Sequence, residues 1–167
     1  MIFALVLLAG ALNAQDKFVY TEASELNLIG KLIDTPNPYH RVDTVKYKGF
    51  TKGENQQVRN SAGLAVLFKT TSSVIKLRPE YAHIGDSDRT MAQSMRGYDL
   101  YIKKDGRWLY AESGSSGRND MKGKEITMIK NMPEGVKECM LYLPLQSELV
   151  SLKIGVEAGS TLEALES

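Results

Sequence analysis

The sequence contains a single cysteine, Cys139, and only two histidines, His40 and His83. One cysteine cannot form an intramolecular disulfide, and two widely separated histidines without a cysteine pair lack the ligand spacing of a zinc site. Cys139 stands within the stretch Glu-Cys-Met-Leu-Tyr-Leu, which is typical of a buried thiol, and no histidine and asparagine pattern marks it as a nucleophile. We therefore expect no metal, no cofactor and no cysteine catalysis.

An excess of charge of either sign is also missing. The 167 residues include 21 lysines and arginines and 20 aspartates and glutamates, for a net charge of +1. Because a protein that binds nucleic acid or an anionic membrane needs a basic face, this balance argues against nucleic acid as a partner. The length and the 43% of hydrophobic residues are sufficient for one domain with a core, and they argue against disorder.

A long hydrophobic run is absent as well, so we expect no transmembrane segment. The apolar run at residues 2–12 is shorter than the roughly 20 residues that cross a bilayer. Ala14 follows it and precedes the charged Asp16 and Lys17, a pattern typical of a secretory signal peptide. We expect residues 1–14 to be cleaved near Ala14 and the protein to be secreted or periplasmic. No basic residue precedes the run, and a buried N-terminal strand or helix is the alternative.

The rest of the chain contains short apolar runs separated by glycine, proline, asparagine and aspartate. Val150, Leu152 and Ile154 alternate with more polar or small residues, the pattern of a half-buried strand. Asp105-Gly106 between two aromatic-rich runs predicts a hairpin, because glycine supplies the positive φ of a tight turn. We expect strands at 18–21, 27–32, 44–48, 63–69, 73–78, 98–103, 107–111, 124–130, 137–143 and 149–156.

Nine or ten short antiparallel strands predict an all-β fold, a β-sandwich of jelly-roll type, with a closed barrel as the alternative. Few stretches show helical periodicity, although residues 88–93 could form a helical turn. The tail 159–167 has no strand pattern.

Two short strings are similar to catalytic blocks of SGNH-type hydrolases. Residues 85–88 read Gly-Asp-Ser-Asp, and residues 117–120 read Gly-Arg-Asn-Asp. A serine nucleophile needs a histidine base oriented by a carboxylate, and in those enzymes the base comes from an Asp-x-x-His near the C-terminus. No histidine follows His83 in this sequence. We therefore expect Ser87 to lie in a polar loop, and we assign no catalytic residue to this chain.

A more specific resemblance rests on residues 96–101, which read Arg-Gly-Tyr-Asp-Leu-Tyr. The Gly-x-Asp-Leu-Tyr string resembles the signature of the N-terminal domain of bacterial SGNH/GDSL-type esterases, especially secreted ones of Bacteroidetes. Residues 39–41 resemble the Tyr-x-Arg element of that family, residues 60–70 its Ser-x-Gly-hydrophobic strand, and residues 142–145 its Tyr-Leu-Pro-Leu strand. The resemblance covers about residues 25–160, and the motif residues that it assigns are Tyr39, Arg41, Gly97, Asp99, Leu100 and Tyr101.

The resemblance implies a non-catalytic β-sandwich at 15–160, with 161–167 as the start of a linker. The implied partner is the protein's own C-terminal SGNH hydrolase domain, a carbohydrate or lipid esterase, on which the sandwich would pack. The chain would then be a truncated protein, a gene fragment or a stand-alone relative. The alternative function is a free-standing glycan-binding module, and an independent hydrolase that uses Ser87 is the third and least favoured reading.

Several of the motif residues have an expected physical role. Gly97 would allow a close backbone approach, and Leu100, together with Ile102, would face the core. Asp99 would accept backbone N–H bonds or pair with Arg41 or Arg96.

Aromatic residues gather in the predicted hairpin. Tyr98, Tyr101, Trp108 and Tyr110 could form a surface that binds a sugar or the missing domain, because the faces of aromatic rings pack against the CH groups of a pyranose. Alternatively, these rings fill the core.

Overall fold

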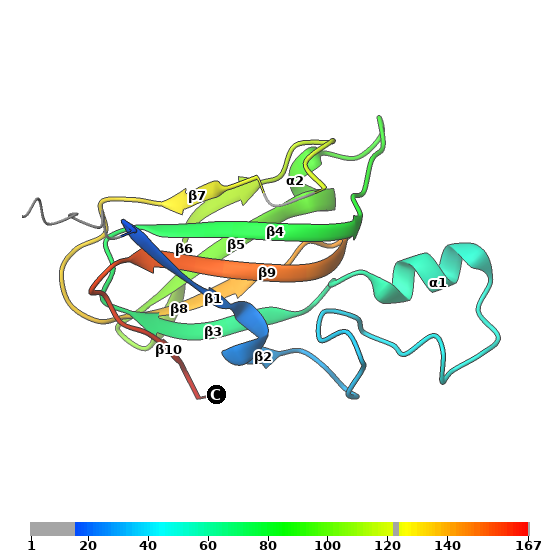
Figure 1. Cartoon of the computed structure of the whole chain (residues 1–167), viewed down its shortest axis with the longest axis horizontal. Coiled ribbons are helices and arrows are strands. Elements are labelled where there is room, and N and C mark those ends of the chain that lie inside the picture. The colour runs from blue at the N-terminus through cyan, green and yellow to red at the C-terminus, as the bar shows by residue number, and fades with distance from the viewer. Residues whose placement is uncertain (1–15, 122–123, 167) are drawn as a thin grey trace, which may run out of the picture.

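The structure, a computed structural model, describes residues 16–121 and 124–166. Within these residues, strands form two antiparallel sheets that pack face to face (Figure 1), which confirms the predicted all-β sandwich. The strands are β1 (Phe18–Glu22), β2 (Asn27–Ile29), β3 (Ala65–Thr70), β4 (Ile75–His83), β5 (Gly97–Lys104), β6 (Arg107–Ser115), β7 (Ile126–Ile129), β8 (Lys137–Tyr142), β9 (Glu148–Glu157) and β10 (Leu162–Ala164). Sheet A has the order β1-β9-β4-β7, and sheet B has the order β10-β3-β8-β5-β6, with β2 also paired to β3.

The core lies between the two sheets and follows the period-two alternation of the strands. In β3, Val66 and Phe68 are fully buried in the core, whereas Ala65 and Leu67 belong to a separate cluster on the outer face of sheet B. Each fully buried side chain of this size contributes about 1.5–3 kcal/mol to folding. The Asp105-Gly106 hairpin is also confirmed, because both residues have positive φ between the paired strands β5 and β6.

All expected strands except 44–48 coincide with an observed strand. Residues 44–46 form a turn in which the carboxylate of Asp43 accepts hydrogen bonds from the backbone N–H groups of Val45 and Lys46, at 2.9 and 3.1 Å. The strand prediction at 44–48 is therefore wrong. Its apolar residues are too few to form a buried face, and the aspartate stabilises the turn instead.

The segment that follows contains the helix α1 (Lys52–Arg59), which periodicity does not predict because none of its residues is buried. Its signal is instead a capping box, in which Thr51 Oγ1 accepts from the backbone N–H of Glu54 and the Glu54 carboxylate accepts from the N–H of Thr51. The second helix, α2 (Ala92–Arg96), begins near the end of the predicted helical turn, and a single turn of 3₁₀ helix (Ala23–Glu25) joins β1 to β2.

Two further expectations about strands need correction. The tail does contain a strand, since β10 pairs with β3 at the edge of sheet B. Val150 does not share the buried face of Leu152 and Ile154, because it is the extra residue of a β-bulge and is 51% exposed. Leu149 takes its place in the core.

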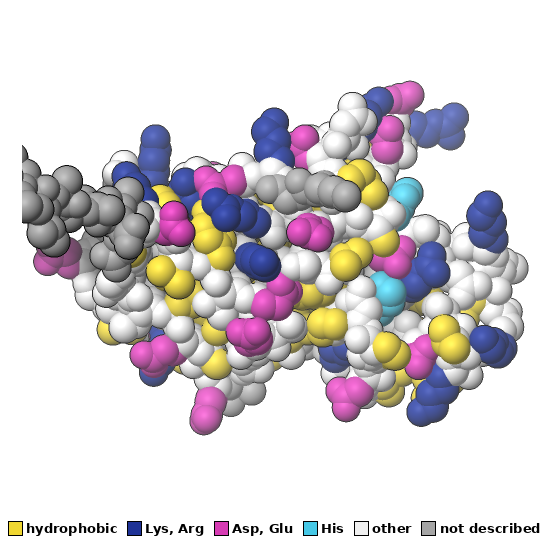
Figure 2. Space-filling model, viewed as in Figure 1, with side chains coloured by type: hydrophobic (Ala, Val, Ile, Leu, Met, Phe, Trp, Pro, Cys, Tyr) yellow, Lys and Arg dark blue, Asp and Glu magenta, His cyan; other side chains and the backbone are white. Residues whose placement is uncertain are grey.

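The outer face of sheet A carries charged side chains (Figure 2). Glu125 forms ion pairs with Lys76 and Arg78 and accepts a hydrogen bond from the Tyr20 hydroxyl. These contacts, chiefly the one with Lys76, lower the pKa of Glu125 to about 2. None of the described helices is long and apolar enough to cross a membrane, and the predicted signal peptide at 1–14 lies outside the described residues.

Candidate functional site

The segments that carry the motifs meet at one end of the sandwich, next to α1 and α2 (Figure 1). Their centre is Ser147, in the loop between β8 and β9. The Ser147 hydroxyl accepts from the N–H of Gly85 at 3.1 Å and donates to the carbonyl of Met95 at 3.0 Å. The Ser147 carbonyl accepts from the N–H of Ser61 at 3.4 Å. We call this part of the molecule the motif end.

Tyr39 anchors the first motif segment in the core. Its side chain is fully buried, and its hydroxyl donates to the carboxylate of Glu22. Glu22 also accepts from the Ser151 hydroxyl at 2.6 Å and from the N–H of Leu152 at 3.0 Å. Burial first, and then the hydrogen bond to Glu22, raise the pKa of Tyr39 far above its usual value. The phenol therefore stays protonated and serves as a structural donor.

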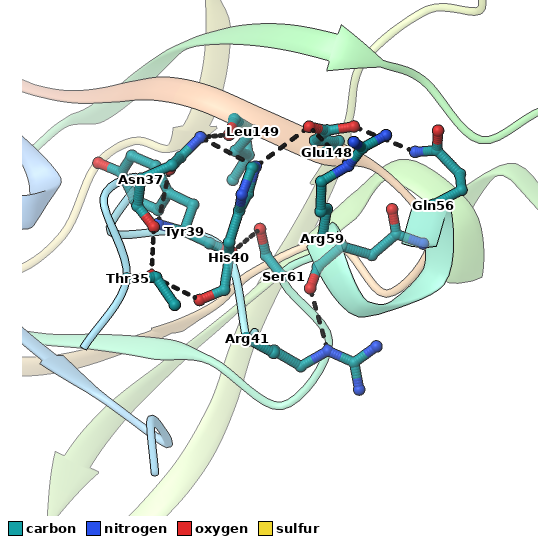
Figure 3. Close-up of polar contacts among 11 residues, drawn as sticks. Thr35, Asn37, Tyr39, His40, Arg41, Gln56, Arg59, Ser61, Glu148 and Leu149 are labelled. Atoms are coloured by element: carbon teal, nitrogen blue, oxygen red, sulfur yellow. Dashed lines mark hydrogen bonds and ion pairs between the residues drawn. The ribbon is translucent and has the colours of Figure 1, made fainter. Parts of the chain in front are cut away.

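His40 lies beside a buried carboxylate (Figure 3). Its Nε2 is 3.1 Å from Oε1 of Glu148, and the same oxygen lies 3.3 Å from Nε of Arg59. The other carboxylate oxygen of Glu148 accepts a hydrogen bond from the side chain of Gln56. Burial lowers the pKa of His40 in spite of the neighbouring carboxylate. Glu148 thus ties the loop at 37–41 and the helix α1 to the start of β9.

Arg41 caps the C-terminal end of α1. Its backbone N–H donates to the carbonyl of Val58 at 3.2 Å, its Nε donates to the carbonyl of Asn60 at 3.1 Å (Figure 3), and its Nη2 donates to the carbonyl of Gln57. A cation at this end also interacts favourably with the helix dipole. These bonds join the segment at 37–41 to the C-terminal end of α1.

Gly97 begins β5 at a point where no side chain fits. A Cβ atom there would lie 2.2 Å from the carbonyl oxygen of Gln93, so the expected close approach is confirmed. Leu100 lies in the core and Ile102 packs against it, as expected. Asp99 faces the outer side of sheet B, where its Oδ1 accepts one long hydrogen bond, of 3.5 Å, from Nε2 of Gln93.

The expectation that Asp99 pairs with Arg41 or Arg96 is wrong. Arg96 is buried and donates to the carbonyls of Ser116 and Gly85, at 2.9 and 3.2 Å, while Arg41 donates to the carbonyls at the end of α1. Both guanidinium groups are thus held by backbone carbonyls on other elements. Asp99 keeps acceptor capacity on the surface of the sheet.

The aromatic residues divide between the core and the surface. Tyr98 is fully buried and its hydroxyl lies 2.6 Å from that of Tyr81, so it cannot belong to an exposed aromatic surface. Tyr101, Trp108 and Tyr110 do lie on the outer face of sheet B.

Tyr142, which sequence reasoning did not single out as a surface aromatic, lies next to Tyr101 on the same face. The ring of Tyr101 meets those of Tyr110 and Tyr142 edge to face, at 80° and 75°. These rings are therefore not coplanar and do not form one continuous flat surface.

Two hollows flank the loop between β8 and β9 at the motif end. The first has a volume of about 330 Å³. Its lining includes Gly97, Asp99, Tyr101, Tyr142 and Leu145, and we call it the motif groove.

The second hollow has a volume of about 410 Å³ and also reaches Leu145. It is polar, and its lining includes Arg41, Asn60, His83 and Asp86. The exposed side chain of Leu145 thus separates two hollows of different polarity.

The two strings that are similar to catalytic blocks, at 85–88 and 117–120, lie near each other. Arg118 Nε lies 2.9 Å from Oδ1 of Asp86, which joins the two loops that carry the strings. The Ser87 hydroxyl accepts from the N–H of Arg89 at 3.1 Å, and no hydrogen bond between Ser87 and a histidine occurs among the described residues. In residues 16–121 and 124–166, no three histidine, cysteine, aspartate or glutamate side chains are grouped to hold a metal.

Ser147 and Glu148 were not expected to organise the site. They lie one residue beyond the Tyr-Leu-Pro-Leu segment, after Gln146, and both are buried polar residues. A serine and a glutamate between two apolar runs ordinarily indicate an exposed turn, so the sequence contains no sign of their burial.

Comparisons with known proteins agree with the motifs. A model of the family GxDLY, described as the N-terminus of SGNH hydrolase-type esterases, matches residues 17–162. A protein whose crystal structure is described as a GDSL-like lipase from Bacteroides ovatus is 38% identical in sequence to this chain. The two structures have a TM-score of 0.83, and the match covers 90% of this chain. This chain spans 44% of the length of that protein.

The salicylyl-acyltransferase SsfX3 of a tetracycline biosynthetic pathway shares the fold. It is 21% identical with a TM-score of 0.55, and the match covers 93% of this chain and 41% of the transferase. The comparison with curated proteins found no match.

Proposed function

Since this chain belongs to the GxDLY family, the N-terminal domain of SGNH hydrolase-type esterases, we propose that it is a non-catalytic accessory domain that packs on the hydrolase domain of such an esterase. We infer from the family that the whole enzyme hydrolyses carbohydrate or lipid esters. The proposal includes export of the protein to the periplasm or the outside of the cell, with loss of residues 1–14. The segment 161–167, which contains β10, would lead to the hydrolase domain.

One observation carries the proposal: most of the family's motif residues serve the fold of this domain. Tyr39 binds Glu22 inside the sandwich, Arg41 caps α1, and Gly97 makes room for the carbonyl of Gln93. Ser87, the one serine in a hydrolase-like string, interacts with the backbone of its own loop. This pattern supports an accessory role, because nucleophilic catalysis requires an activating base and an oxyanion hole.

Ester hydrolysis tests the proposal directly. We expect this chain to hydrolyse p-nitrophenyl acetate no faster than buffer does. In the enzyme with both domains, we expect Ser87→Ala to keep the activity within about twofold, since Ser87 stabilises no transition state. Hydrolysis by this chain that disappears in Ser87→Ala would overturn the proposal. A circular dichroism spectrum of each variant provides the control for folding.

A further inference from the structure

The two outer faces of the sandwich differ in chemistry. The charged groups on sheet A bind one another, with Lys76 and Arg78 paired to Glu125. Sheet B also carries two ion pairs on its outer face, Lys69 with Glu163 and Lys103 with Glu138. Beside them lies an apolar cluster, made of the buried Ala65, Leu67 and Met140 with the partly buried Ile29, Tyr101, Trp108 and Leu165. Since Ala65, Leu67 and Met140 are already buried within this chain, a neighbouring domain would gain chiefly by covering the exposed Tyr110 and the partly buried Tyr101 and Trp108.

The motif groove continues this apolar face at the motif end. Tyr142 is 39% exposed and Leu145 is 51% exposed, and both line the groove. Asp99 also lines it, and its long hydrogen bond to Gln93 leaves its carboxylate able to accept a second donor. The groove therefore fits an apolar segment that presents one cation or N–H group.

The course of the chain points to the same place. Strand β10 is antiparallel to β3, so it runs toward Ala65, which pairs with Tyr142 of the groove. After β10, the N–H of Leu165 donates to the carbonyl of Leu67 at 3.3 Å, and the Leu165 side chain packs on the outer face of sheet B. The last described residues thus approach the motif groove along the apolar face.

We propose that the motif groove, together with the apolar outer face of sheet B, is the docking surface for the hydrolase domain of the same protein. The hydrolase domain inserts an apolar segment between Tyr101, Tyr142 and Leu145 and places a basic side chain or a backbone N–H against Asp99. The inference rests on the proposed function. The family's motif is then an interface motif as well as a folding motif, because Gly97, Asp99 and Tyr101 all line the groove.

Cysteine accessibility in the protein that carries both domains tests the inference. Leu145→Cys and Val150→Cys form a matched pair, since both residues are 51% exposed in this chain and lie on different faces. Val136→Cys, at an exposed position between β7 and β8, is a further control. Native Cys139 is fully buried and gives no background under native conditions, and its labelling in denaturant is measured with the unsubstituted protein and subtracted. Any cysteine of the hydrolase domain is replaced by serine.

The measurement is the rate of maleimide labelling under native conditions, divided by the rate in denaturant. We expect Leu145→Cys to react at least about tenfold more slowly than Val150→Cys and Val136→Cys, because burial of a thiol suppresses its reaction. Fast labelling at Leu145→Cys with protection at another position would overturn the docking surface and leave the accessory role standing. Fast labelling at all three positions would likewise overturn the docking surface, whereas the accessory role is overturned only by the ester hydrolysis described above. Because all three residues are exposed, the variants should fold, and thermal unfolding checks this.

Discussion

The hydrogen bond between Tyr39 and Glu22 should be a measurable part of the stability of this domain. Tyr39→Phe removes only the hydroxyl, so the ring still fills its fully buried position. The half-buried Glu22 carboxylate keeps its donors Ser151 and Leu152 but loses the third, the hydroxyl of the fully buried Tyr39. A hydrogen bond to a charged group contributes about 1.5–3 kcal/mol, and we expect Tyr39→Phe to lower the free energy of unfolding by about 2 kcal/mol.

Urea unfolding, followed by the fluorescence of Trp108, the single tryptophan, measures this loss. In a thermal scan, about 2 kcal/mol corresponds to a decrease in Tm of roughly 4–8 °C for a domain of this size. Tyr47→Phe is the matched control, because Tyr47 is 42% exposed, and its loss should stay below about 0.5 kcal/mol. The reasoning is refuted if Tyr39→Phe and Tyr47→Phe unfold at the same urea concentration with equal slopes.

Three further substitutions or measurements test other parts of the structure. Gly97→Ala places a Cβ 2.2 Å from the Gln93 carbonyl oxygen and should destabilise the domain by about 2–3 kcal/mol in urea unfolding. Gly53→Ala in α1 has nothing within 4 Å of its Cβ and should stabilise the domain by about 0.5–1 kcal/mol. Equal effects of the two substitutions would contradict the close packing at Gly97. Because the pKa of Glu125 is lowered from 4.5 to about 2, its contribution to stability is fully present above pH 4.5 and is lost as the pH falls through about 2. The free energy of unfolding should therefore fall by about 1 kcal/mol less between pH 7 and pH 2 in Glu125→Gln than in the unsubstituted protein, after discounting for solvent screening. Parallel pH profiles of the two proteins would contradict the ion pairs. Cys139 is fully buried and its pKa is raised to about 12, so Ellman's reagent should react with it only after unfolding, and rapid reaction of the native protein would show the core to be open.

The strands of this protein other than β10 were predictable because each is a short run with a local pattern. The hairpin at Asp105-Gly106 needs only the two residues that adopt positive φ. The burial of Tyr98 follows from the same pattern, since Tyr98 shares its side of β5 with Leu100 and Ile102, and an exposed Tyr98 conflicts with that alternation. The capping box of α1 was also present in the sequence, as a threonine three residues before a glutamate.

Other features depend on pairing that a sequence does not display. The β-bulge at Val150 turns this side chain of β9 away from the core, because β4 pairs with Leu149 and Ser151 and skips the residue between them. The strand β10 was misjudged for a related reason, because its few apolar residues become a strand only through pairing with β3. The turn at 44–46 differs, since its signal is the adjacent Asp43, which binds backbone N–H groups two and three residues on.

The amino-acid sequence by itself determined the class of fold and the family, because strand alternation and the Gly-x-Asp-Leu-Tyr motif are local properties of the chain. Only the tertiary structure decided what the motif residues do. It turned Arg41 and Arg96 toward backbone carbonyls, buried Ser147 and Glu148 at the motif end, and placed Tyr142 beside Tyr101 on an apolar outer face. The physical reason is that these hydrogen bonds and apolar contacts join residues distant in sequence, and the register of the strands decides which of those residues meet.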